Sequence, residues 1–64
     1  MKLIVVKKIE GKVDKKNMEY RVEVQYDGKV KNVRVDKKRF FRAVEGGRIE
    51  VTRNEIADGI DVED

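Results

Sequence analysis

The stretch that decides the fold is residues 18–26, Met-Glu-Tyr-Arg-Val-Glu-Val-Gln-Tyr. Every second residue is apolar or aromatic, and those between are charged or polar. Side chains in a β-strand point alternately to opposite faces, so this pattern predicts a strand with one face on a core and one in water. Asp27-Gly28 follows directly, and this dipeptide suits a two-residue turn with positive φ. The segment therefore predicts a strand that enters a tight hairpin.

Strands are also expected on both sides of this segment. Residues 3–9 begin with a Leu-Ile-Val-Val run, typical of burial on both faces, and then alternate. The polar residues 11–17 form a connection short enough for an antiparallel return. Residues 29–35 predict a third strand, although its apolar parity shifts between Val30 and Val33. Either a bulge near Lys31-Asn32 or a frayed start accounts for that shift.

The hydrophobic period changes after Asp36, which is a suitable helix N-cap. Three apolar residues fall on one helical face, namely Phe40, Phe41 and Val44. Gly46-Gly47 offers a left-handed stop at the other end. We therefore expect a short helix over residues 37–45 that covers one face of the sheet.

The C-terminal part has a weaker pattern. Ile49 and Val51 predict a fourth short strand, and Ile60 and Val62 predict a short edge strand. Ile56 is expected in a turn between them.

The order β-β-β-α-β predicts an α+β fold, a small antiparallel sheet of three to five strands with one short helix packed on it. An SH3-like or OB-like small barrel, with the helix as a connecting turn, is the alternative. We expect residues 1–64 to form one globular domain, with 55–64 as an acidic, partly flexible C-terminal segment. A domain of this size has a limited core, so a homodimer is a further expectation.

The composition argues against an enzyme. The chain has no His, Cys or Ser, the residues that most often act as nucleophiles and neutral-pH bases. We expect no cofactor and no metal site, because the C-terminal acids do not match the spacing of a calcium loop. The longest apolar run, residues 3–6, is far too short for a membrane span or a signal peptide, so a cytoplasmic location is expected. The many Lys and Glu residues are typical of proteins from thermophilic organisms.

The charges are unevenly distributed. Residues 1–44 carry 14 Lys and Arg against 6 Asp and Glu, a net charge of +8, whereas residues 45–64 carry 2 against 7, a net charge of −5. In one interpretation the acidic end folds back on the basic body and forms weak surface pairs. In the other, the basic face meets a polyanion and the acidic segment competes for it.

The start of the expected helix is locally unfavourable. Lys37, Lys38 and Arg39 would occupy its first turn, where the helix dipole is positive. Departures from local rules are expected at functional sites, and a helix start with free N–H groups and several cations suits a phosphate. The candidate anion-binding residues are Lys37, Lys38, Arg39 and Arg42, with help from Arg21 and Arg34.

The four aromatic residues are Tyr20, Tyr26, Phe40 and Phe41. Their pattern predicts core packing, with Tyr26 at the hairpin tip as the exception.

Two hypotheses follow. The first is a non-enzymatic binding module for nucleic acid or another polyanion, with weak sequence specificity and strong salt dependence. The second is a protein-interaction or structural module, a homodimer or accessory subunit, that pairs through the edge of the first or fourth strand.

Overall fold

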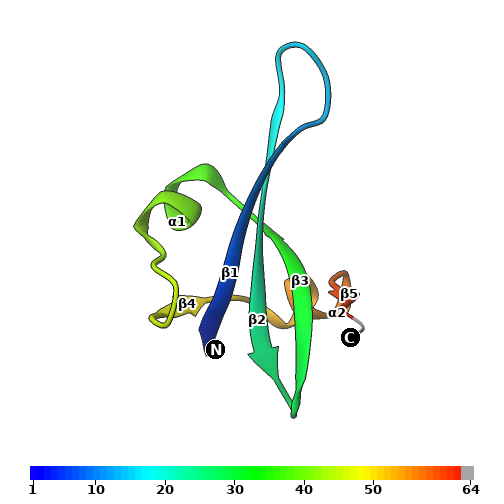
Figure 1. Ribbon diagram of the computed structural model, residues 1–64. Coiled ribbons are helices and arrows are strands. Elements are labelled where there is room, and N and C mark those ends of the chain that lie inside the picture. Colours follow the sequence, from blue (N-terminus) through cyan, green and yellow to red (C-terminus); the bar gives the residue numbers. More distant parts are fainter. Residues whose placement is uncertain (63–64) are drawn as a thin grey trace.

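The computed structural model describes residues 1–62 and places the 18–26 segment in the middle of a five-stranded antiparallel sheet of order β4-β1-β2-β3-β5 (Figure 1). The elements in chain order are β1 (Lys2–Lys12), β2 (Met18–Tyr26), β3 (Lys29–Val35), α1 (Lys37–Arg42), β4 (Arg48–Glu50), α2 (Arg53–Ala57) and β5 (Ile60–Asp61). The α+β class is confirmed, with two short helices where one was expected.

The β2–β3 hairpin forms as its sequence indicates. Asp27 and Gly28 have φ values of 51° and 74°, the left-handed conformation that a two-residue hairpin turn requires. The register runs without a shift from the turn to the pair of Tyr20 with Val35, so the bulge considered near Lys31-Asn32 is absent. Val30 instead lies on the face opposite the core, and its carbonyl accepts a hydrogen bond from the Val62 N–H at 2.9 Å. The shift in apolar parity therefore means that Val30 and Val33 lie on opposite faces of a regular strand.

A β-bulge occurs in β1, between Val5 and Lys7. Before it, Val5 pairs with Val24; after it, Lys8 pairs with Val22, so the extra residue transfers Lys8 to the core side of the sheet. Lys8 is partly buried there, and its Nζ donates to the Ala43 carbonyl at 2.8 Å. The bulge thus makes room for a cation beside α1.

Beyond the bulge, β1 and β2 continue as a projecting arm, defined here as residues 10–19 (Figure 1). Its last strand pair is Lys12 with Met18. The Asp14 carboxylate closes the loop by accepting hydrogen bonds from the backbone N–H groups of Lys16 and Asn17, both at 2.8 Å. These local bonds give the arm an ordered tip.

The core lies on one face of the sheet, under both helices. Its buried residues are Val5, Val22, Val24, Val33, Val35, Phe40, Ala43, Ile49, Val51 and Ile56. The opposite face, here called the outer face, carries the residues of the other parity, such as Glu23 of β2 and Asn32 of β3. Neither helix contributes core residues to that face.

Helix α1 is shorter than expected, because the backbone becomes extended at Ala43 (φ −72°, ψ 143°). The core-facing residues are Phe40 and Ala43, and the expectation that Phe41 and Val44 share that face is wrong: they are 57% and 66% exposed. A helix of six residues presents only a narrow stripe to the sheet. Gly46 (φ 84°) shapes the turn into β4 and does not cap the helix.

The C-terminal region contains a helix that the sequence reasoning missed. Thr52 and Glu55 form a reciprocal capping box at the start of α2, and Ile56, expected in a turn, lies buried in this helix. The expected edge strand is present as β5, which pairs with β3 and contains Ile60, whereas Val62 lies just beyond its end. Glu63 and Asp64, the end of the acidic segment, lie outside the described residues.

The strand order leaves β4 and β5 as the two edges over residues 1–62. Because β1 pairs with β4 through its first residues and with β2 through the rest, the sheet bends along β1, an arrangement compatible with a small barrel-like fold. No helix of the described chain is long and apolar enough to cross a membrane.

Candidate functional site

The structure separates the candidate cations into three groups. Arg39 points towards β4 and α2, while Arg21 and Arg34 pair directly across β2 and β3 on the outer face. The third group lies on the solvent side of α1 and consists of Lys37, Lys38 and Arg42. The sequence therefore grouped residues that the fold divides between different surfaces.

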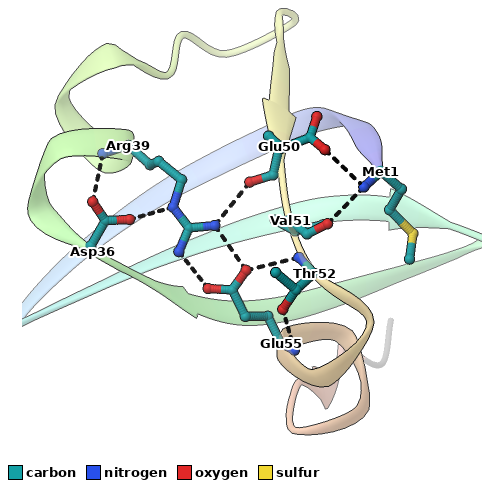
Figure 2. A network of polar contacts seen from close by, with 7 residues as sticks. All are labelled: Met1, Asp36, Arg39, Glu50, Val51, Thr52 and Glu55. Atoms are coloured by element: carbon teal, nitrogen blue, oxygen red, sulfur yellow. Dashed lines mark hydrogen bonds and ion pairs between the residues drawn. The ribbon is translucent and has the colours of Figure 1, made fainter.

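Arg39 lies at the centre of a polar cluster, here called the Arg39 junction: Asp36, Arg39, Glu50, Thr52 and Glu55 (Figure 2). Its guanidinium forms ion pairs with the carboxylates of Asp36 and Glu55, and its Nη1 donates to the Glu50 carbonyl at 2.9 Å. Glu55 also accepts the Thr52 N–H at 2.9 Å. The cluster joins α1 to β4 and to the start of α2, so Arg39 has a structural role.

The ionisation of the junction follows from these contacts. The hydrogen bond from Arg39 is the main cause that lowers the pKa of Glu55 from 4.5 to about 2, while partial burial acts in the opposite direction. The same guanidinium lowers the pKa of Asp36. The hydrogen bond to Glu55, and to a smaller extent the one to Asp36, raises the pKa of Arg39. All three groups are therefore charged at neutral pH.

Arg21 and Arg34 differ in their surroundings: Arg21 is paired with an acid, whereas Arg34 is exposed and outside the ion pairs of the described residues. Arg21 forms an ion pair with Glu19 and donates to the Asn32 side chain at 2.9 Å. With Val35 and two acidic residues of the C-terminal region, Glu55 and Asp58, the two arginines line a shallow hollow. Both arginines lie on the face of the sheet away from α1, and the hollow beside them is lined by acids as well as by cations.

The third group forms the most cationic of these surfaces. Successive helical residues are about 100° apart, so with Phe40 on the core, Lys38 and Arg42 lie on the opposite side of α1, and Lys37 and Phe41 lie on the flank next to them. These four residues are here called the α1 surface, and all are exposed. Within residues 1–62, none of its three cations takes part in an ion pair.

The helix start is capped by Asp36 as the sequence predicts, and this removes one of the free N–H groups that a phosphate was expected to use. The Asp36 side chain accepts the Arg39 N–H, so the carboxylate of the cap occupies a donor that a phosphate would otherwise use. A six-residue helix also has a small dipole. The side chains of the α1 surface, and not the backbone at the helix start, are therefore the candidate anion-binding groups.

Phe41 is the residue that the sequence reasoning placed wrongly in the core. Its ring packs edge-on against Tyr20 and Phe40, with centroid distances of 5.6 and 5.3 Å, and still leaves most of the side chain exposed. A signal was present: adjacent residues of a short helix cannot both face the sheet. Tyr26, the expected exception, is partly exposed at the other end of β2.

Comparison of the chain with protein-family models, curated proteins and solved structures finds no match. A functional proposal therefore rests on the chain's own surfaces. Of these, the α1 surface combines exposed positive charge with an exposed aromatic ring.

Proposed function

We propose that this protein is a non-enzymatic binding module for a polyanion, nucleic acid in particular, and that the α1 surface is its contact. One observation carries the proposal: Lys37, Lys38 and Arg42 are exposed and outside every ion pair of the described chain, whereas Arg39 in the same helix is fully engaged. Contacts from such side chains to phosphates position a nucleic acid without reading its bases, so binding is weakly sequence-specific.

The placement of the acids supports this. Glu55 pairs with Arg39, and Asp61 pairs with Lys31 at 3.3 Å, so these members of the acidic segment are held by cations other than those of the α1 surface. These two acids therefore pair with the basic body, as one interpretation of the acidic end expects. Their pairs do not compensate the positive charge of the α1 surface within residues 1–62.

The test is a titration of labelled oligonucleotides, followed by fluorescence anisotropy at several salt concentrations. Three phosphate contacts give a slope of log K against log salt of about −2 for a single strand and about −3 for a duplex. Replacement of Lys37, Lys38 and Arg42 by Gln should abolish most of the affinity and flatten that slope.

The matched control removes the same charge elsewhere. Lys2, Lys29 and Arg53 are exposed and lie outside the ion pairs of the described residues. Their replacement by Gln should retain most of the affinity. Equal losses in the two triple variants, or no binding at low salt, would contradict the proposal.

A protein partner is the second candidate, and the outer face is the observation that favours it. Ile4, Ile60 and Val62 are exposed large apolar residues there. The edges are less suitable, since β4 has three residues and the start of β1 is already paired with β4. A dimeric mass by light scattering that reverts to a monomer with Ile60→Lys would support this candidate, whereas a monomeric wild type would exclude the homodimer.

A further inference from the structure

Phe41 is the part of the α1 surface that phosphate binding does not use. It is 57% exposed, whereas its neighbour Phe40 in the same helix is only 5% exposed. Edge-on contacts with Tyr20 and Phe40 hold its ring in place. An exposed aromatic ring held by its neighbours, in a helix with three exposed cations, is suited to stack on a planar group that carries negative charge beside it.

The ring also continues an apolar row along the arm. Met18 and Tyr20 are two residues apart on β2, so they share the face of the sheet that bears Val22. Tyr20 touches Phe41, and the three residues Phe41, Tyr20 and Met18 are here called the ledge. In Figure 1 the arm extends beyond α1, so the ledge leads from the helix along the arm.

Cations lie at both ends of the ledge. The α1 surface provides Lys37, Lys38 and Arg42 at one end. At the other, Lys12 pairs directly with Met18, so its side chain lies on the same face. Residues 15–16, both lysines, follow in the exposed arm loop. An aromatic and apolar row between two groups of cations matches the way proteins hold an extended single strand.

Resting on the proposed function, we propose that the protein binds single-stranded nucleic acid, with one base stacked on Phe41 and phosphates on the α1 surface and on Lys12. A duplex hides the faces of its bases within the stack, so only an unpaired base can use the ring. Glu10, which pairs with Tyr20 in the ladder, places one carboxylate beside this path. Glu10→Gln should therefore tighten binding by about twofold, the scale of one screened surface charge.

The chain offers a direct probe, because it contains no Trp. Phe41→Trp introduces a single indole at the position of the ring, and stacking of a base on it would quench its fluorescence. The ligands are an oligothymidylate of about 15 nucleotides, a duplex of equal length and inorganic polyphosphate. Only the single strand should quench the indole, although all three ligands bind. Tyr26→Trp, at the far end of β2, is the matched control and should not respond.

A second variant measures the energetic effect. Phe41→Leu keeps an apolar side chain and all the charges; it should weaken single-strand binding by about tenfold, the usual effect of losing one base–aromatic stack, and leave polyphosphate binding and the salt slope unchanged. Circular dichroism and urea unfolding check that the variant is folded.

The outcomes distinguish the two proposals. Equal quenching by duplex and single strand, or equal losses for oligothymidylate and polyphosphate with Phe41→Leu, would overturn the stacking inference and leave the polyanion proposal intact. Absence of binding to all three ligands at low salt would overturn both.

Discussion

Arg39 and Lys38 are neighbours in one short helix, yet the structure gives them different surroundings. The Arg39 guanidinium contacts two carboxylates and a backbone carbonyl, one of those carboxylates from a residue 16 positions further along the chain. Lys38 is exposed and outside the ion pairs of residues 1–62. The difference arises from a rotation of about 100° around the helix axis. The direction in which a cation points, and not its identity, determines whether it stabilises the fold or remains free for a ligand.

The chemistry of the side chains reinforces this division. A guanidinium presents several donors in one plane and can bridge two carboxylates at once, as Arg39 does with Asp36 and Glu55. A lysine ammonium is a mobile, strongly hydrated charge suited to phosphate contacts that do not depend on sequence. The Arg39 junction and the α1 surface therefore predict opposite responses to substitution.

The largest effect on stability is expected for Arg39→Gln. It breaks the ion pairs with Asp36 and Glu55 and leaves the partly buried Glu55 without its main partner. The free energy of unfolding should fall by about 2 kcal/mol, which corresponds to a decrease in Tm of roughly 10 °C for a domain of this size. Urea and thermal unfolding measure it. Lys38→Gln is the matched control, and an equal loss there would remove the distinction between the two cations.

The contribution of the Arg39 junction should also be visible in the pH dependence of the free energy of unfolding. Because the pKa of Glu55 is lowered from 4.5 to about 2 in the folded protein, its contribution is complete above about pH 4.5 and is lost as the pH falls towards 2. Glu55→Gln should lower stability at pH 7 by about 1.5 kcal/mol and flatten the decline in this range. Unfolding by urea between pH 7 and 2 measures both. If Glu55→Gln keeps the wild-type pH profile, the loss of stability in this range does not come from Glu55.

A smaller effect is expected for Thr52→Ala. The Thr52 hydroxyl accepts the Glu55 N–H at 3.1 Å and caps α2, so its loss should cost about 1 kcal/mol. The Arg39–Glu55 pair remains in this variant, which separates the contribution of the cap from that of the ion pair. A loss as large as that of Arg39→Gln would mean that the cap, and not Arg39, holds the junction together.

The smallest effect on stability has the opposite sign. Lys37→Glu and Lys38→Glu place acids in the first turn of α1, which contains none, and each should raise stability by about 0.5 kcal/mol. Both should weaken nucleic-acid binding, since they reverse charges of the α1 surface. A gain in stability with unchanged binding would show that these lysines are ordinary solvated residues.

The parts of the fold predicted from sequence depend on local chemistry. The alternation of residues 18–26 and the Asp27-Gly28 turn specify a hairpin without reference to the rest of the chain. Asp36 was predicted correctly as an N-cap for the same reason. The α2 helix was missed although Thr52 and Glu55 form a capping box, because five residues are too few to show a helical period.

The sequence by itself determined the class of fold, the hairpin, and the concentration of positive charge in residues 1–44. Only the tertiary structure decided that a bulge in β1 turns Lys8 inward, that Glu55 reaches Arg39, and that Phe41 remains exposed. Side-chain alternation and turn conformation are set by neighbours along the chain. Which cation is paired and which ring is uncovered depends on elements far apart in sequence that pack against the same sheet.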